Sequence, residues 1–413
     1  MNREALVYAD LEGIPTFVGH LWSRVRNGRE STSFQYTEKW LNSRSRFPLE
    51  PALMLGKEPH HAPADKALFG ALGDSAPDRW GRMLIRRAQR RNATREGRTP
   101  RSLFEIDYLL MVNDETRAGA LRFRENETGP FLAPGHTVRV PPLIKLPQLL
   151  AATQHFEAEE ETDADLKLLL APGSSLGGAR PKASVLDKNN KLLIAKFPQK
   201  SDEYNVVLWE AVALSLASQA GITVPEYRIE KVLNKPVLLL KRFDRMNNFR
   251  IPFLSAMSML TARDNEMHSY LEIVDAIRQQ GARVTQDIQQ LWRRIVFNIM
   301  ISNTDDHLRN HGFLYGQDGW HLSPAYDLNP IPLDIRPRIL STAIDNDDAN
   351  GTIELAMSVI NYFGLSHKQA KEIMAEVATA VSKWRKEAKK MGISNQEMER
   401  MSSAFELSEI NHG

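Results

Sequence analysis

The chain has 413 residues, of which 42% are hydrophobic and 25% charged, a balance that is ordinary for a globular protein of two or three domains. Its formal net charge is only +2, so overall charge does not mark it as a nucleic-acid binder. The absence of cysteine excludes disulfides, thiolate nucleophiles and cysteine metal sites.

The N-terminal residues carry acidic side chains early and lack an apolar core, unlike a secretory signal. No run of about 18 apolar residues occurs, so no membrane span is expected. A cytoplasmic location is therefore the expectation.

Residues 4–40 alternate short apolar runs with glycine and polar turns, which favours a small β-rich unit. A helix is predicted over residues 76–92. Eight arginines fall from Arg82 to Arg101, and two interpretations stay open for them. They can form a solvated helix face, or a docking patch for an acidic partner or DNA.

The middle of the chain predicts strands around one helix. Residues 125–148 are rich in proline and glycine and indicate a connection, and residues 157–165 form an acidic stretch typical of a solvated helix start. Residues 171–198 predict a loop, a strand, a turn and a second strand. A helix is expected over 203–220, closed by Gly221.

After residue 255 the pattern is helical, with candidates at 286–301 and 366–391. Ser366 is a plausible N-cap of the second candidate and Gly392 a stop. The order of elements predicts an α+β fold with a β-rich N-terminal module and a helical C-terminal lobe.

The first chemical feature is a glycine-rich loop that contains Ser174, Ser175, Gly177, Gly178 and Ala179. Small residues let backbone N–H groups approach phosphate oxygens closely. Such a loop is weak evidence alone, because glycine-rich turns between strands are common.

The second feature is Lys196, which ends the apolar segment LLIAK. In kinases a strand lysine in a V-A-I-K pattern pairs with the phosphates of ATP. Glu210, on the following predicted helix, is the natural carboxylate to hold this lysine. An exposed lysine at a strand end and a solvated glutamate are the simpler alternatives.

The strongest motif is NTDDHLRN, residues 303–310, a polar stretch after an apolar helix. Asp305 and Asn310 have the Asp-to-Asn spacing of the kinase catalytic loop H-R-D-x-x-x-x-N. Asp305 would orient a substrate hydroxyl, and the Asn310 oxygen would bind magnesium. A polar helix-capping turn is the less attractive alternative.

The fourth feature is Asp327, which lies 17 residues after Asn310. The intervening segments 313–315 and 320–322 predict a hairpin around a Gly-Gln-Asp-Gly turn. Such a hairpin would return Asp327 to Asn310, as kinases place a second magnesium-binding aspartate beside the catalytic loop.

With these motifs in order, nearly the whole chain resembles the HipA family of bacterial toxin serine/threonine kinases. The N-terminal part, with GDSAPDR at 73–79, is similar to the family's N-terminal module, and SLGGARPK at 175–182 is similar to its loop. Residues 242–245, RFDR, match the segment that links the lobes. The catalytic and metal motifs match at 305–310 and 325–328.

The resemblance implies a two-lobed, protein-kinase-like fold. It implies an N-terminal module at 1–110, a kinase N-lobe at 111–243 and an all-helical C-lobe at 244–413. Lys241, Phe243 and His307 would contact ATP beside the residues already named, with Mg²⁺ as the second cofactor. Ser175 would be autophosphorylated, with Ser174 as the alternative, and such a phosphate would repel ATP.

The resemblance further implies transfer of phosphate to a protein hydroxyl, in known cases on an aminoacyl-tRNA synthetase, and growth arrest. A HipB-like helix-turn-helix antitoxin would be the partner and would carry most of the contact with operator DNA. Arg180 and Pro181 depart from the loop pattern, which puts the reach of its backbone in doubt. A small-molecule or lipid kinase, or a catalytically inactive co-repressor, are the alternatives.

Overall fold

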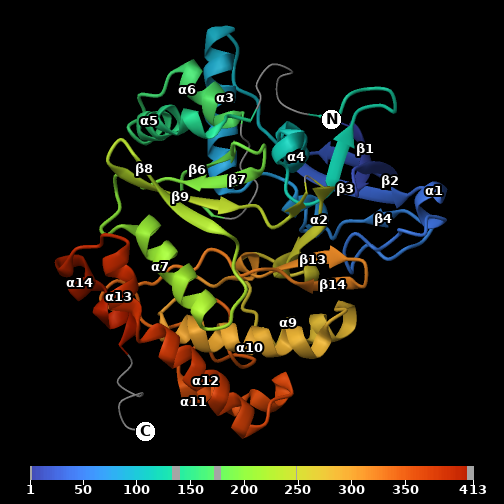
Figure 1. The fold of residues 1–413 in the computed structure, drawn as a ribbon. Coiled ribbons are helices and arrows are strands. Elements are labelled where there is room, and N and C mark those ends of the chain that lie inside the picture. Colours follow the sequence, from blue (N-terminus) through green and yellow to red (C-terminus); the bar gives the residue numbers. More distant parts are fainter. Residues whose placement is uncertain (1, 133–139, 172–177, 248, 407–413) are drawn as a thin grey trace. The chain divides into compact units, whose positions relative to one another are not determined.

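The computed structural model describes residues 2–132, 140–171, 178–247 and 249–406. The chain forms two compact units, one of Met1–Lys200 with Glu230–Leu254 and one of Ser201–Ile229 with Ser255–Gly413. Figure 1 shows the elements in chain order, with strands concentrated in the first unit and helices in the second. The expected mixed α and β composition, with a β-rich N-terminal region, is confirmed.

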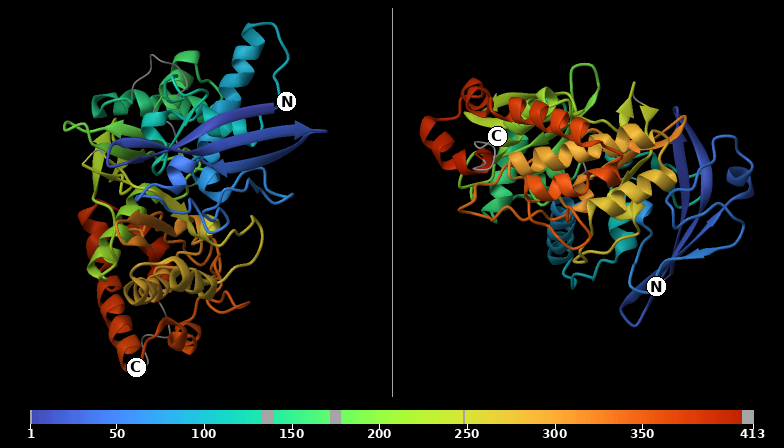
Figure 2. Two further views of the ribbon diagram at one scale, coloured as in Figure 1. Left: turned by 90° about the vertical axis from the view of Figure 1, so that its right-hand side faces the viewer. Right: turned by 90° about the horizontal axis from the view of Figure 1, so that it is seen from below.

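The β-rich N-terminal module is an antiparallel sheet in the order β4-β3-β2-β1-β5, and its long strands are seen in blue in Figure 2. Two short turns join its first three strands. Glu12–Gly13 and Asn27–Gly28 have φ values from 52° to 81°, the left-handed conformation of a tight hairpin turn. The strands are β1 (Asn2–Leu11), β2 (Ile14–Arg26), β3 (Arg29–Tyr36), β4 (His60–His61) and β5 (Leu121–Arg124).

A second sheet of the first unit has the order β6-β7-β9-β8. Its described pairs are antiparallel, and Lys196 in β7 lies opposite Lys182 in β6 and Leu238 in β9. The strands are β6 (Lys182–Leu186), β7 (Leu192–Lys196), β8 (Tyr227–Val232) and β9 (Lys235–Lys241); short strands follow at β10 (Arg245–Met246), β11 (Phe249–Arg250) and β12 (Phe253–Ser255). The predicted turn between β6 and β7 contains Asn190 at φ 57°.

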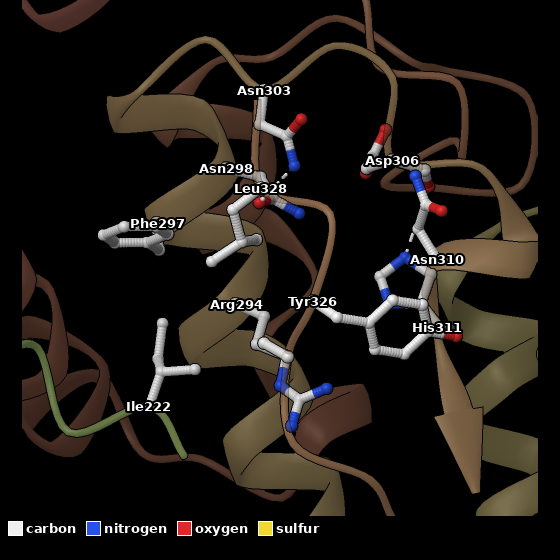
Figure 3. A pocket seen from close by; sticks show the side chains of 11 residues that line it. Ile222, Arg294, Phe297, Asn298, Asn303, Asp306, Asn310, His311, Tyr326 and Leu328 are labelled. Carbon is white, nitrogen blue, oxygen red and sulfur yellow. Dashed lines mark hydrogen bonds between the residues drawn. The ribbon is translucent and has the colours of Figure 1, made fainter. Parts of the chain in front are cut away.

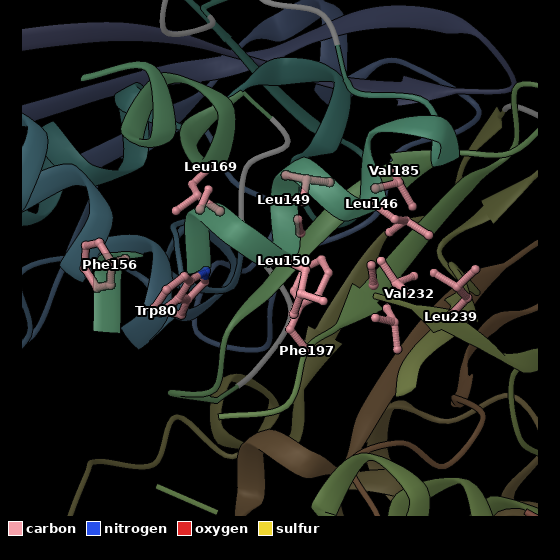
Figure 4. Packing of buried hydrophobic residues seen from close by; sticks show 14 of the residues in the cluster. Trp80, Leu146, Leu149, Leu150, Phe156, Leu169, Val185, Phe197, Val232 and Leu239 are labelled. Atoms are coloured by element: carbon pink, nitrogen blue, oxygen red, sulfur yellow. The ribbon is translucent and has the colours of Figure 1, made fainter. Parts of the chain in front are cut away.

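Helices of the first unit pack on this sheet around one apolar cluster (Figure 4). Trp80, Leu149 and Phe197 are each at most 2% exposed, and Trp80 also donates its indole N–H to the Lys182 carbonyl at 3.0 Å. The helices that contribute to this cluster are α3 (Arg79–Arg95), α5 (Leu146–Glu157) and α6 (Asp163–Leu170). The unit also contains α1 (Glu38–Leu41), α2 (Gly70–Asp74) and α4 (Glu105–Met111), with 3₁₀ turns η1 (Asp114–Thr116) and η2 (Leu143–Lys145).

The arginine-rich helix α3 pairs with acidic side chains of its own unit. Arg87 lies 3.3 Å from Glu159, and Arg91 and Arg95 lie 3.3 and 3.5 Å from Asp163 on α6. Six of the eight arginines from 82 to 101 make such ion pairs. This pairing favours the solvated helix face over the docking patch, because the acidic stretch at 157–165 neutralises much of the charge.

The second unit is mainly helical, with one hairpin between β13 and β14 among its described residues. The expected all-helical C-lobe at 244–413 is therefore wrong in this respect, since that range contains this hairpin and the short strands β10 to β12. The hairpin confirms the predicted return of the chain before Asp327. The elements are α7 (Val206–Gln219), α8 (Ala256–Met259), α9 (Tyr270–Gln280), α10 (Val284–Met300), η3 (Leu308–Asn310), β13 (Gly312–Gly316), β14 (Gly319–Leu322), α11 (Ile353–Ser358), η4 (Ile360–Phe363), α12 (His367–Val381), α13 (Trp384–Lys390) and α14 (Asn395–Phe405).

The prediction of one helix over 366–391 is wrong in one respect, since the chain breaks into α12 and α13 at residues 382–383. The break lets Trp384 turn inward, where it stacks on Phe405 with ring centres 4.8 Å apart. Both predicted ends are confirmed. Ser366 caps α12 through the backbone N–H of Gln369, and Gly392 has φ 79°. None of the helices in the described part of the chain is long and apolar enough to cross a membrane.

Candidate active site

The catalytic-loop motif follows α10 directly. Ser302 turns the chain with φ 49°, and its hydroxyl donates to the Ala404 carbonyl at 2.9 Å. The next residues run as an extended segment into the 3₁₀ turn at Leu308–Asn310. Because α10 is an amphipathic helix with a large buried face, its C-terminal end fixes the start of the loop.

Adjacent aspartates in this loop have opposite environments. The side chain of Asp305 is 51% exposed, whereas Asp306 is 1% exposed. Burial raises the pKa of Asp305, His307 lowers it, and the nearby charge of Asp327 raises it. Of these two adjacent aspartates, only Asp305 therefore has a carboxylate that solvent can reach. For Asp306, complete burial raises the pKa to about 7.

The Asn310 side chain is oriented by one hydrogen bond from its nitrogen, and its oxygen accepts none from the described residues. Its Nδ2 donates to the Asp305 carbonyl at 2.7 Å, which fixes the side-chain orientation. Its Oδ1 is buried and has no hydrogen-bond partner among the described residues. A buried amide oxygen without a donor is costly, so this atom is suited to a ligand or cation.

Asp327 returns to the same loop after the β13–β14 hairpin. Its φ of 59° is a conformation that aspartate tolerates better than most residues. Its neighbours are tied to the catalytic loop on both sides. Tyr326 donates to the Arg309 carbonyl at 2.7 Å, and the Asn329 N–H donates to Asn303 Oδ1 at 3.2 Å. The structure thus brings Asp305, Asn310 and Asp327 to one place in the second unit.

Two of these side chains, Asp327 and Asn310, fit a magnesium site chemically. Mg²⁺ prefers carboxylate and carbonyl oxygens and takes few protein ligands when phosphates supply the others. Asp327 offers a carboxylate, and Asn310 offers the buried oxygen described above. Figure 3 shows Asn310 and Asp306 on the wall of a small pocket under this loop, which Arg294, Tyr326 and Leu328 also line.

The other predicted residues lie mostly in the first unit. Lys196 ends β7, Lys241 ends β9 opposite Leu193, and the Phe243 ring lies 6.1 Å from that of Phe253. Glu210 is buried in α7 of the second unit, and its pairing with Lys196 stays a prediction. His307 belongs to the catalytic loop.

Only part of the glycine-rich loop, from Gly178 onward, lies within the described residues. Gly178 has φ 90°, a conformation that favours glycine, and Ala179 is exposed. Ser174, Ser175 and Gly177 lie outside the described residues, so the phosphate contacts and the autophosphorylation site stay predictions.

Two contacts between charged side chains were not predicted from the sequence. Lys182 makes a buried ion pair at 2.8 Å with Asp78, and it also donates to the Gly178 carbonyl at 3.3 Å. The Arg336 guanidinium lies 4.0 Å from Asp305. Both partners of the buried pair stood in motifs already noted, GDSAPDR and SLGGARPK, but nothing in the sequence links positions 104 residues apart.

Comparison with known proteins gives two family matches. Residues 174–384 match the HipA-like C-terminal domain, and residues 13–127 match the HipA N-terminal domain. "Putative kinase Y4mE" of Sinorhizobium fredii is 24% identical over 326 residues, which cover 71% of each chain. "Toxin YjjJ" of Escherichia coli is 26% identical over 170 residues, 38% of each chain.

Among solved structures, HipA of Shewanella oneidensis MR-1, in a complex with HipB and operator DNA, matches with a TM-score of 0.68. The match covers 96% of this chain and 94% of that one at 16% identity. This likeness establishes the fold.

Proposed function

The chain belongs to the HipA family of kinase-like toxins, and on this premise we propose that it is an ATP-dependent serine/threonine protein kinase. The observation that carries the proposal is that Asp305, Asn310 and Asp327 lie close together, and that the buried Asn310 Oδ1 has no hydrogen-bond partner within the described part of the chain. A degenerate kinase that served only as a co-repressor would have no need for such an arrangement.

In the proposed reaction, Asp305 accepts a hydrogen bond from the substrate hydroxyl and takes its proton as the oxygen attacks the γ-phosphorus. The new O–P bond forms while the bond to the β–γ bridging oxygen breaks, and ADP leaves. Asp327 and Asn310 hold Mg²⁺, which when bound neutralises charge on the phosphates. Lys196, Lys241, Phe243, His307 and the loop backbone at Gly177–Ala179 hold ATP.

The wider proposal is a cytoplasmic toxin of a HipBA-like module. Its substrate is a protein hydroxyl, in the first instance on an aminoacyl-tRNA synthetase, and the modification arrests growth. Ser175, or else Ser174, receives phosphate in autophosphorylation. A HipB-like antitoxin binds the toxin and contacts operator DNA. In the HipA structure that matches this fold, HipA stands with HipB and its operator DNA.

Incubation of the purified protein with γ-labelled ATP and Mg²⁺ tests the proposal. We expect rapid self-labelling that mass spectrometry maps to Ser175 or Ser174, and labelling slower by about 10²–10⁴ with Asp305→Asn. Phosphate that appears only on an added lipid or sugar would favour a small-molecule kinase. Failure to bind Mg²⁺–ATP by calorimetry would leave the co-repressor interpretation.

Expression of the wild-type chain and of Asp305→Asn in a growing culture tests the toxin role. We expect arrest only with the wild type, and relief by a short helix-turn-helix protein if one is encoded beside this gene. Growth arrest that persists with Asp305→Asn would show that toxicity does not depend on phosphoryl transfer.

A further inference from the structure

Asp306, the second aspartate of this loop, takes no part in the proposed phosphoryl transfer. Both carboxylate oxygens of Asp306 are engaged inside the second unit. Oδ2 accepts a hydrogen bond from the Tyr270 hydroxyl of α9, and Oδ1 accepts one from the Ser341 backbone N–H at 2.9 Å. Asp306 and Tyr270 are both buried, at 1% and 0% exposure. Both oxygens of this aspartate are therefore occupied by donors of the protein itself.

The Tyr270 hydroxyl continues the connection to the loop that carries Asp327. Asn298 of α10 donates through Nδ2 to the Tyr270 oxygen at 3.1 Å. Asn303 donates to Asn298 Oδ1 at 3.0 Å, a bond visible in Figure 3, and accepts from the Asn329 N–H at 3.2 Å. A series of hydrogen bonds, buried from Asp306 to Asn303 and part-buried at Asn329, thus joins Asp306 to a residue two positions after Asp327.

The backbone of Asp306 is fixed as well. Its carbonyl accepts from the Thr342 hydroxyl at 2.7 Å and from His311 Nε2 at 3.2 Å. Ser341 closes the same region through its hydroxyl, which donates to the Thr304 carbonyl at 2.8 Å. Thr304 and Asp306, on either side of Asp305, are therefore buried and held by hydrogen bonds, although Asp305 itself is half exposed.

We propose that Asp306 and Tyr270 are positioning residues, which hold the Asp305 and Asp327 segments in register for phosphoryl transfer. The inference rests on the proposed kinase activity, since it assigns the geometry of that site to a buried pair outside it. A loop displaced by about 1 Å can lower a rate 10²-fold, so loss of the pair acts on turnover more than on ATP binding.

The test compares Tyr270→Phe with Tyr362→Phe. Both remove a tyrosine hydroxyl that donates to an aspartate, and the control hydroxyl lies 2.6 Å from an oxygen of Asp275, also on α9. We expect Tyr270→Phe to lower kcat about 10-fold with the KM for ATP within about 2-fold of wild type. The control should leave both constants unchanged.

A second test compares a conservative and a disruptive substitution at Asp306. Asp306→Asn keeps an oxygen for Ser341 and a polar group for Tyr270, so we expect kcat within about 3-fold of wild type. Asp306→Ala removes both contacts, and we expect a loss of about 100-fold in kcat. Equal activity of the alanine and asparagine variants, or a KM effect that exceeds the kcat effect, would overturn the positioning role.

Hydrogen exchange of the 303–311 segment separates this inference from the proposed function. If the wild type transfers no phosphate, the kinase proposal fails, and exchange still decides the second question. Faster exchange in Tyr270→Phe than in Tyr362→Phe, with similar unfolding temperatures, supports positioning. Identical exchange in the two variants contradicts it whether or not the protein is a kinase.

Discussion

The Arg336 guanidinium lies 4.0 Å from the Asp305 carboxylate, on the segment that follows Asp327. Both side chains are about half exposed, at 42% and 51%. The positive charge of Arg336 lowers the pKa of Asp305 and opposes the rise that burial and Asp327 cause. Arg336 therefore favours the ionised form that can accept a proton.

Replacement of Arg336 by glutamine should move the acid limb of the kcat/KM pH profile to higher pH. Without the guanidinium the pKa of Asp305 rises, so the carboxylate is protonated at a pH where the wild type is still active. Two charges 4 Å apart in water interact by about 1 kcal/mol, which limits the shift to less than about one pH unit. Salt should reduce the shift, because the pair is exposed.

Arg336→Lys should keep most of the wild-type profile. Arg385→Gln is the matched control, since Arg385 is also an ion-paired arginine of the second unit with a side chain 40% exposed. An unchanged acid limb in Arg336→Gln, measured at low ionic strength, would mean that Arg336 does not act on Asp305.

Replacement of Asp305 and replacement of Asp327 should affect different steps, turnover in the first case and Mg²⁺–ATP binding in the second. Asp305→Asn should lower kcat by about 10²–10⁴, the usual range for loss of a general base, and leave Mg²⁺–ATP binding largely intact. Asp327→Ala should remove Mg²⁺-dependent ATP binding itself. Calorimetry with and without Mg²⁺, beside initial rates, distinguishes the two. Full activity of a folded Asp305→Asn protein would assign the base elsewhere.

The sequence indicated the candidate catalytic loop because its motif is local. The spacing of Asp305 and Asn310, and the turn of the hairpin before Asp327, can all be read within 23 residues. The roles of Asp306 and Tyr270 could not be read in this way, since 36 residues separate them. A buried hydrogen bond of this kind depends on how helices pack, which the sequence pattern does not specify.

The same limit explains the charged patches. The arginines of α3 and the acidic stretch near Asp163 looked like two separate features, because about 70 residues lie between them. Packing of α3 beside α6 turns them into one ion-paired surface. Similarly, the apolar pattern of 366–391 predicted a continuous helix, and only the docking of Trp384 against Phe405 explains the break.

Stability of the first unit should fall as pH rises from about 5 to 8, partly because of Glu50. This carboxyl is 2% exposed and accepts a hydrogen bond from the Ala71 N–H, and burial raises its pKa to about 7. The folded state then binds more protons than the unfolded state between the unfolded and folded pKa values. The contribution of Glu50 to the free energy of unfolding is therefore complete at low pH and is lost as the pH rises through the folded pKa.

Glu50→Gln should flatten this dependence, because the amide keeps the acceptor for Ala71 without a charge. The expected change is up to about 1.4 kcal/mol for each pH unit between the two pKa values. Unfolding midpoints in urea at pH 5 and pH 8 measure it, with the exposed Glu38→Gln as control. The same pH dependence in Glu50→Gln and in the wild type would show that Glu50 does not take up a proton on folding.

The buried ion pair between Asp78 and Lys182 gives a last prediction. Their side chains are 6% and 4% exposed, and the pair joins the N-cap of α3 to the start of β6, next to Gly178. Removal of one partner of a buried ion pair typically costs about 3–5 kcal/mol. Asp78→Asn should therefore destabilise the first unit, although an asparagine can still cap α3 through the Gly81 N–H.

The double variant Asp78→Asn with Lys182→Met should recover much of that loss, because neither charge then remains buried. Urea unfolding followed by tryptophan fluorescence reports on the change, since Trp80 lies in this unit and donates to the Lys182 carbonyl. Arg82→Gln serves as control, because its partner Glu105 is 37% exposed and can be hydrated when left alone. If Asp78→Asn costs no more than this control, water reaches Lys182 in the folded protein and the pair contributes little to stability.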